Sequence, residues 1–480
     1  MCTSWARSRA SSLVSSRLTY VRTVAGLRNR RLAISSFERP APFTVPLPVP
    51  PVLSPTPAGH YEITQRAADV EILPGLRTSV WGYNGIFPGP TIESRRGQQT
   101  VVRHTNQLPV PVVVHLHGGR TPAEHDGYPT DYVHPGSVRD YVYPLDQAAA
   151  TLWYHDHRMD FTGPQVYKGL AGFHLVRDDE EGALPLPRGE REVPLMIADR
   201  AFAEDGSFAY PALDPSLHGA PGVEGDFMSG VLGDCVLVNG APWPVMEVTN
   251  TRYRFRILNA SNARRYLLAL EPGGPLVQIG SDQGMLAAPV SHDELQIAQA
   301  ERYDVVIDFS QYSIGQEVTM VNRLGSDGTA NVMRFVVARR GREESRIPSR
   351  LASVRPLSRS DAVVERKFVF QRGGASHHGV SLWTVNGEAF STSRIAASPK
   401  LGSVELWKLH AQNVPHPIHI HLAPFQVVGG TGGWKDTVDL SSGDSAEVLL
   451  RFDGYRGKYV FHCHNLEHED MMMMANFEVT

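Results

Sequence analysis

Four histidine pairs are the feature of the sequence that most clearly suggests chemistry. Each has the pattern His-x-His, and a chain with 20 histidines among 480 residues would contain roughly one such pair by chance. On a β-strand, residues two apart point to the same side, so each pair can offer two imidazoles to one site. Zinc takes only three or four ligands, whereas eight imidazoles suit a cluster of three copper ions. The pairs are His115/His117, His155/His157, His419/His421 and His462/His464.

Cys463 differs from the other cysteines because a histidine stands on each side of it. Since neighbouring side chains of a strand point to opposite sides, Cys463 can bind a different metal ion from the two histidines beside it. Two further histidines and a methionine could complete the trigonal ligand set of a blue-copper electron-transfer site. The candidates for this set are His416, Cys463, His468 and Met473.

The methionine of this set is the least specific member. Met473 belongs to a run of four, so Met472 and Met474 remain alternative ligands. Simple core packing would also explain a run of methionines near the end of a β-domain. The remaining cysteines, Cys2 and Cys235, cannot form a disulfide framework, and Cys235 is expected to be a buried, inert thiol.

The histidine clusters recur at equivalent places of a repeated unit. Three Asn-Gly turns, 155 and 147 residues apart, each precede alternating strands that are typical of a β-sandwich. The first unit has histidine pairs at two places, and the third has them at the same places together with the cysteine set. The second unit has neither, which predicts a spacer domain. The turns are Asn84-Gly85, Asn239-Gly240 and Asn386-Gly387.

Length and composition agree with three all-β domains. The chain is too long for one core, and its 43 Gly and 35 Pro favour short strands joined by turns. The predicted domains span residues 58–190, 191–345 and 346–480, after a proline-rich arm at 38–57. A net charge of −4 gives no reason to expect a nucleic-acid partner. The sequence also has no apolar run long enough to cross a bilayer.

The first 37 residues have a different composition. They contain seven Arg, eight Ser and no Asp, Glu or Lys, which predicts a disordered tail or a targeting segment. Arg30-Arg31 is similar to a twin-arginine export signal, but the apolar stretch that follows is too short for one. The compartment, cytoplasmic or reached by export, therefore stays open, as does the presence of residues 1–37 in the mature protein.

Taken together, these motifs resemble the signatures of the multicopper oxidases. Within that family the chain looks most like the spore-coat laccase, phenoxazinone synthase and bilirubin oxidase group, which the stretches around Asp282 and Asp436 also match. Val414-Pro415 stands where fungal bilirubin oxidases carry a Trp, which weakens bilirubin as a substrate. The matching stretches are His115-Leu116-His117-Gly118, Trp153 to His157, His416 to His421, and His462-Cys463-His464 with His468 and Met473.

The resemblance implies a fold and four copper ions. The fold is three consecutive cupredoxin-like Greek-key β-sandwich domains. His115 and His419 would bind the type 2 copper, and the blue-copper set named above would bind type 1. Asp126 and Glu469 match positions that assist proton delivery, although ordinary surface carboxylates are the alternative. The type 3 pair would be bound by His117, His155, His157, His421, His462 and His464.

The resemblance also implies the reaction. A laccase-like oxidase would take single electrons from phenols or aminophenols and reduce dioxygen to water, with a small donor and dioxygen as its partners. A cuprous or metal-ion oxidase in copper tolerance, or a copper-binding coat or storage protein, is the alternative. The chain is expected to be a monomer. The glycine-rich turn at 429–433 is expected to border the type 1 site and leave an edge of His416 or His468 open to bulky donors. The alternative is that this turn lies at the far end of the sandwich, where its length has no effect.

Overall fold

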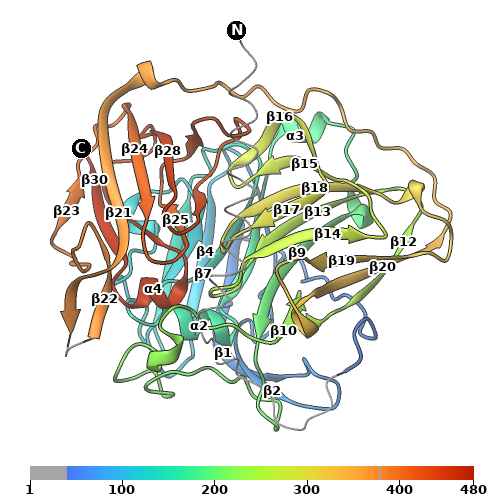
Figure 1. Ribbon diagram of the computed structural model, residues 1–480, viewed down its shortest axis with the longest axis horizontal. Coiled ribbons are helices and arrows are strands. Elements are labelled where there is room, and N and C mark those ends of the chain that lie inside the picture. The colour runs from blue at the N-terminus through green and yellow to red at the C-terminus, as the bar shows by residue number, and fades with distance from the viewer. Residues whose placement is uncertain (1–39, 378–379) are drawn as a thin grey trace.

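The computed structural model describes residues 40–377 and 380–480, so the predicted tail at 1–37 lies outside the described residues. Within these residues, six sheets form three consecutive pairs along the chain, which we call the first, middle and third domains. In the view of Figure 1, the third domain lies on the left and the middle domain on the right. Strands of the first domain are visible between them.

The first domain consists of two four-stranded sheets. Its strands are β1 (His60–Val70), β2 (Thr78–Tyr83), β3 (Ile92–Arg95), β4 (Thr100–Asn106), β5 (Val114–His117), β6 (Val138–Tyr143), β7 (Ala150–Asp156) and β8 (Ala171–Arg177). The sheet orders are β2-β1-β4-β6 and β3-β8-β7-β5, and apolar side chains such as Ile63, Val102 and Leu152 fill the space between them. The non-sequential orders show that strands cross between the sheets, as Greek-key connections require.

The middle domain has a seven-stranded and a five-stranded sheet. Its strands are β9 (Glu192–Arg200), β10 (Cys235–Val238), β11 (Ala241–Pro242), β12 (Val245–Thr249), β13 (Arg252–Asn259), β14 (Tyr266–Glu271), β15 (Leu276–Ser281), β16 (Gly284–His292), β17 (Glu294–Ile297), β18 (Arg302–Asp308), β19 (Glu317–Asn322) and β20 (Asn331–Arg339). The orders are β11-β10-β9-β13-β18-β15-β16 and β12-β20-β19-β14-β17. Cys235 is buried in the core between them, as predicted.

The third domain has two five-stranded sheets. Its strands are β21 (Ala362–His377), β22 (Val380–Val385), β23 (Ile395–Ala397), β24 (Val404–Ala411), β25 (His416–Ile420), β26 (Phe425–Val427), β27 (Thr437–Leu440), β28 (Ser445–Arg451), β29 (Gly457–Cys463) and β30 (Met474–Val479). The orders are β22-β21-β24-β28-β26 and β23-β30-β29-β25-β27. Strands β25 and β29, which carry half of this domain's candidate ligands, are therefore neighbours in one sheet.

Helices are few and short. They are α2 (Thr162–Lys168), α3 (Asp179–Ala183) and α4 (Leu466–Asp470), with 3₁₀ turns η1 (Ala123–His125), η2 (Gly189–Arg191), η3 (Gly225–Phe227), η4 (Phe309–Gln311), η5 (Asp327–Thr329) and η6 (Arg359–Asp361). Among the described residues, no helix is both long and apolar enough to cross a membrane.

The three Asn-Gly turns are built alike. Both residues of each turn have a positive φ, which asparagine and glycine tolerate better than other residues. In every copy the Asn side-chain oxygen also accepts a backbone N–H from a nearby strand, at 2.8 Å. The donors are Thr64, Met196 and Val369 on β1, β9 and β21. The repeat seen in the sequence is thus a repeat of tertiary contacts.

The proline-rich arm contacts two domains. Phe43 and Leu47 donate backbone hydrogen bonds to the carbonyls of Trp243 and Val245 in the middle domain. Leu53 donates to Thr91 in the first domain. The arm therefore joins the two domains along one edge.

Helix α2 has a charged side chain at each end. The N–H groups of Thr162 and Gly163 donate to the carboxylate of Asp470 at 2.8 Å each. At the other end, the Arg200 guanidinium donates to the carbonyls of Tyr167 at 2.8 Å and Val166 at 3.1 Å. A helix dipole favours this arrangement, with an anion at the N-terminus and a cation at the C-terminus. Asp470 belongs to α4 and Arg200 to β9, so α2 links the middle and third domains.

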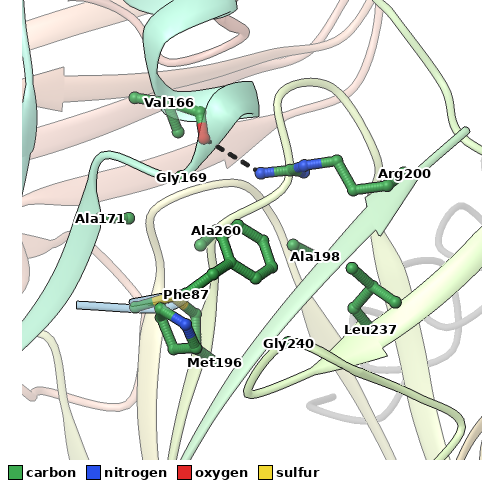
Figure 2. Close-up of a pocket in the computed structure, with 11 residues that line it drawn as sticks. Phe87, Val166, Gly169, Ala171, Met196, Ala198, Arg200, Leu237, Gly240 and Ala260 are labelled. Carbon is green, nitrogen blue, oxygen red and sulfur yellow. Dashed lines mark hydrogen bonds between the residues drawn. The ribbon is translucent and has the colours of Figure 1, made fainter. Parts of the chain in front are cut away.

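Arg200 also lines a small cavity between the first and middle domains (Figure 2). The rest of the wall is mostly apolar and includes Phe87, Ala171, Met196 and Ala260. Arg200 is buried, and burial lowers the pKa of its guanidinium. The carbonyls at the end of α2 therefore provide the polar contacts that stabilise this buried cation.

Replacing Arg200 tests this link. Arg200→Met removes the donors, so the buried Tyr167 carbonyl loses its partner and the Val166 carbonyl keeps only the Gly169 N–H. This change should lower the midpoint of thermal unfolding by about 5 °C. The matched control is Arg340→Met at an exposed position, where we expect a change of about 1 °C or less. Differential scanning calorimetry of both variants measures the difference. Equal shifts of the unfolding midpoint in the two variants would show that Arg200 contributes no more to stability than a surface arginine does.

Candidate metal centres

The pairing of β25 with β29 separates the third domain's candidate ligands into two groups. Ile418 lies opposite Cys463, and His419 lies opposite His462. Ile418 and Cys463 point into the core between the third domain's sheets. His416 has the same parity along its strand as Ile418, so it faces the same side. His419 and His462 face the other side, toward the first domain.

The first domain presents histidines in the same way. On β5 and β7, His115 lies opposite His155 and His117 lies opposite Trp153. Because these positions alternate with core residues, the imidazoles share one face of their sheet. The indole ring of Trp153 stacks on His155 with ring centroids 4.2 Å apart. This face of the first domain meets the ligand-bearing face of the third domain.

All eight predicted cluster histidines come together between the first and third domains. His115 stacks on His421 with ring centroids 3.8 Å apart, and His117 stacks on His419 at 3.6 Å. The centroids of His157 and His462 are 4.9 Å apart, and those of His155 and His464 are 5.3 Å apart. All eight side chains are buried. Neither domain alone contains more than four of them.

Backbone carbonyls fix the orientation of several imidazoles. The Nδ1–H groups of His115, His155 and His419 donate to the carbonyls of Asp126, Asp156 and Asp436 at 2.6, 2.8 and 2.9 Å. This leaves their Nε2 atoms free to face the centre of the cluster. His117 is reversed, because its Nε2 lies 3.1 Å from an Asp436 carboxylate oxygen. Outer hydrogen bonds of this kind orient metal-binding histidines.

Two buried carboxylates, Asp126 and Glu469, contact three of the four remaining imidazoles. Oδ2 of Asp126 accepts a hydrogen bond from His421 Nδ1 at 2.7 Å. The oxygens of Glu469 lie 3.2 Å from His157 Nδ1 and 3.0 Å from His462 Nδ1. Both acids are almost completely inaccessible to solvent, so the surface-carboxylate alternative is wrong. Burial raises the pKa of Asp126 well above its usual range.

The donor atoms that face the cluster fit metal ions. Burial lowers the pKa of His115, His155 and His157, that of His157 to about 4, which keeps these imidazoles in the neutral form that binds metals. A buried nitrogen without a partner is costly unless an ion occupies the centre. Within the described chain the nitrogens with no hydrogen-bond partner include Nε2 of His115, His155, His157 and His419, Nδ1 of His117, and both nitrogens of His464.

Cys463 forms a second, separate group with His416 and His468. Cys463 Sγ lies 3.4 Å from His416 Nδ1 and 3.5 Å from His468 Nδ1, and the two nitrogens are 3.2 Å apart. An ion at the centre of this triangle would lie about 2 Å from each donor, a usual length for metal–ligand bonds. His416 Nε2–H donates to the Gln412 carbonyl, which leaves Nδ1 for the ion. Burial raises the pKa of the Cys463 thiol, so a bound cation would be needed to make the thiolate.

Met473 lies next to this triangle. The Cys463 N–H donates to the Met473 carbonyl at 3.1 Å, and the Met473 side chain is buried in the same core as Cys463. These contacts are compatible with a ligand role for Met473, which stays a prediction.

The expected open edge of His416 or His468 is wrong. Both side chains are fully buried, with no accessible surface. Trp383 covers His468, with the ring centroids 3.8 Å apart and the rings nearly parallel. The glycine-rich turn is elsewhere, because Gly433 lies against Ser281 and Leu286 of the middle domain. No local pattern around Trp383 indicated that it would cover a residue of the distant helix α4.

Asp436 is a second important residue whose role the sequence did not reveal. Besides contacting His117, its carboxylate accepts two hydrogen bonds from Arg302, at 2.7 and 2.5 Å. Arg302 Nε also donates to the Thr151 carbonyl of the first domain at 2.9 Å. One ion pair beside the cluster therefore joins all three domains. Asp436 lies in a stretch that matched the resembled group, but nothing in the sequence identified its partners.

The chain is similar to known proteins over most of its length. Three models of a family described as multicopper oxidase match residues 64–181, 219–337 and 361–480. A laccase of Bacillus subtilis (strain 168) is 36% identical over 512 residues, which covers 91% of this chain and 98% of the relative. A bilirubin oxidase of Albifimbria verrucaria is 37% identical and covers 94% of this chain and 83% of the relative.

Solved structures agree with these matches. The crystal structure of a laccase from Pediococcus acidilactici superposes with a TM-score of 0.82 at 32% identity. The match covers 92% of this chain and 95% of that one.

Breaking the Asp436–Arg302 pair tests its importance. Asp436→Asn removes the closer of the two buried carboxylate partners of Arg302 and leaves only Asp282, 3.9 Å away, which should cost about 3 kcal/mol of stability. It also weakens the contact that orients His117, so less copper should bind per chain. The control is Asp453→Asn, which alters the partly exposed pair with Arg120 and should cost about 1 kcal/mol or less. Calorimetry and copper analysis give both readouts, and equal losses in the two variants would contradict the expectation.

Proposed function

Since this chain belongs to the multicopper oxidase family, we propose that its two buried ligand groups hold four copper ions with separate tasks. The chain is a laccase-like oxidoreductase that uses copper, a small-molecule reducing substrate and dioxygen. When bound, copper supplies the one-electron redox steps and the reduction of dioxygen to water. The following paragraphs give the proposed contribution of each residue.

The type 1 copper is assigned to the triangle around Cys463. His416, Cys463, His468 and Met473 would hold it. The observation that carries this assignment is the convergence of three donor atoms within 3.5 Å of one another in a buried site. A sulfur and two imidazoles in this arrangement are typical of electron transfer rather than of hydrolysis.

The other three ions are assigned to the eight-histidine cluster. His115 and His419 would bind the type 2 copper, and the remaining six histidines would bind the type 3 pair. The support is that His115, His419 and His421 converge, as do His157, His421 and His462, with the donor atoms of each set within 4.8 Å of one another. His462 and His464 flank Cys463, so a few covalent bonds separate the two copper centres.

Asp126 and Glu469 are assigned to proton delivery. Reducing dioxygen to water consumes protons inside a buried site, and a positioned carboxyl group can supply them. Each acid touches an imidazole of the proposed type 3 pair, which supports this role. Each also holds its imidazole in a fixed orientation, so one side chain would both position a ligand and carry a proton.

The predicted domain boundaries are kept as proposals. Boundaries near residues 190/191 and 345/346 are supported by the sheets, because no described sheet combines strands from two of these ranges. We also propose that the protein acts as a monomer, since one chain contains every proposed ligand.

Replacing Cys463 tests the proposed function. In Cys463→Ser the blue absorption band and the oxidase activity should both disappear. The eight histidines are unchanged, so bound copper should fall by only about one ion per chain. Absorption spectroscopy, copper analysis and oxygen uptake measure the three effects. A blue band that survives the substitution would refute the type 1 assignment.

Amide substitutions test the two acids. Asp126→Asn and Glu469→Gln should slow turnover by about tenfold or more while leaving the blue band nearly unchanged. The loss should appear when reduced enzyme is mixed with dioxygen, and reduction by the donor should be unaffected. Stopped-flow reoxidation at the wild-type rate in both variants would remove the proton role.

The alternative functions predict different donors. A cuprous oxidase should consume oxygen faster with Cu(I) than with a substituted phenol. A storage or coat protein should consume none with either donor, and it would have no use for a cysteine that links two copper centres. Oxygen uptake with the two donors under matched conditions distinguishes all three.

A further inference from the structure

The proposed type 1 site has no ligand that a donor in solvent can touch. His416 and His468 are completely buried, as is Cys463 between them. An electron from a soluble donor must therefore cross at least one further layer of protein. The group in that layer decides how fast the copper is reduced, because electronic coupling falls steeply as the gap between donor and acceptor widens.

Trp383 occupies this layer above His468. Its indole is nearly parallel to the imidazole, at 29° and with centroids 3.8 Å apart, and it also meets His416 edge-on at 5.7 Å. The position is fixed, because the indole N–H donates to the Met228 carbonyl of the middle domain at 2.9 Å. One aromatic ring thus contacts both imidazole ligands.

Arg372 is the exposed residue on the solvent side of Trp383. The two residues are cross-strand partners on β21 and β22. The Arg372 guanidinium lies 5.6 Å from the indole centroid, and its other side-chain contact is a weak one to the Met228 sulfur at 3.9 Å. Within the described residues Arg372 forms no ion pair with a carboxylate. An arginine held this loosely can move aside and let a donor reach the indole.

We propose that Trp383 is the residue through which electrons pass from the donor to the type 1 copper, with Arg372 as its movable cover. This inference rests on the proposed type 1 site. A phenolic donor loses one electron, which the copper ion accepts, and one proton, which goes to solvent. Trp383 provides the π-orbitals between donor and His468 and is neither oxidised nor reduced overall. Its role is therefore to couple the two redox partners.

A competing route runs past His416. Its Nε2–H donates to the carbonyl of Gln412, and Gln412 is exposed. A donor bound there would bypass Trp383, which would then only exclude water from the site. The two routes predict opposite effects when the indole is removed. If Trp383 transfers electrons, its removal slows reduction of the copper. If Trp383 only excludes water, its removal leaves the rate of reduction unchanged or raises it.

The test measures reduction of the copper without oxygen turnover. Copper-loaded wild type and Trp383→Leu are mixed anaerobically with a methoxyphenol, and the loss of the blue band is followed by stopped flow. We expect Trp383→Leu to be slower by about tenfold or more. Trp383→Phe keeps an aromatic ring and should stay within about threefold of wild type. The redox potential of each variant is measured as well, and a loss that the change in potential explains would overturn the proposal.

Trp407 offers a matched control. It is also buried in the third domain, where its ring packs against Phe368 and Phe461, neither of which is a proposed copper ligand. Trp407→Phe should therefore leave the rate of anaerobic bleaching unchanged. A similar slowing in the two tryptophan variants would show a general packing effect and overturn the proposal.

Arg372→Ala gives an independent result at an exposed site. Removing the cover should speed bleaching in the wild-type background and have no effect when Trp383 is already leucine. If Trp383→Leu does not load copper, Arg372→Ala becomes the deciding variant. An unchanged rate of bleaching in Arg372→Ala would then overturn the proposal. Wild type without a blue band would refute the type 1 site itself. If Trp383→Leu has the same blue band as wild type and an unchanged rate of bleaching, only the route through the indole is refuted.

Discussion

The ion pair between Asp436 and Arg302 is the interaction on which the arrangement of the copper ligands depends. Asp436 belongs to the third domain and contacts His117 of the first, while Arg302 belongs to the middle domain and donates to Thr151 of the first. The histidine cluster lies between two domains that share no sheet, so its geometry can be no more accurate than their docking. A buried charged pair has strict distance and direction requirements, which makes it well suited to set that docking.

Polar acceptors around the cluster also position the copper ligands, at shorter range. Carbonyls and a carboxylate hold the outer nitrogens of His115, His155, His419 and His421, so the inner nitrogens of these imidazoles face the centre before any ion arrives. Preorganisation of this kind reduces the conformational entropy that metal binding would otherwise cost. The apolar cores of the sandwiches stabilise each domain, and the polar contacts between domains give the site its shape.

Most of the ligand geometry could be predicted from the sequence because it follows from strand periodicity. Alternation alone places His462 and Cys463 on opposite sides of β29, and the repeat pairs the histidine-bearing strands of the first and third domains. Contacts between distant segments could not be predicted in this way. Arg302 and Asp436 are 134 residues apart, and no local pattern connects them. Trp383 failed to stand out for the same reason, since its role depends on how β22 packs against α4.

The division of the cluster between two domains also fixes when it can assemble during synthesis. His115 precedes His419 by 304 residues, which a ribosome translating roughly 5–20 residues per second needs about 15–60 s to cover. During that interval the first domain can fold and display its four imidazoles without the partners that complete the cluster. The nascent protein therefore carries half of a metal site in contact with the surrounding solution. During this period the four imidazoles cannot complete the coordination of the cluster, and the middle domain supplies no further ligands. Incomplete coordination is therefore what limits the binding of wrong ions.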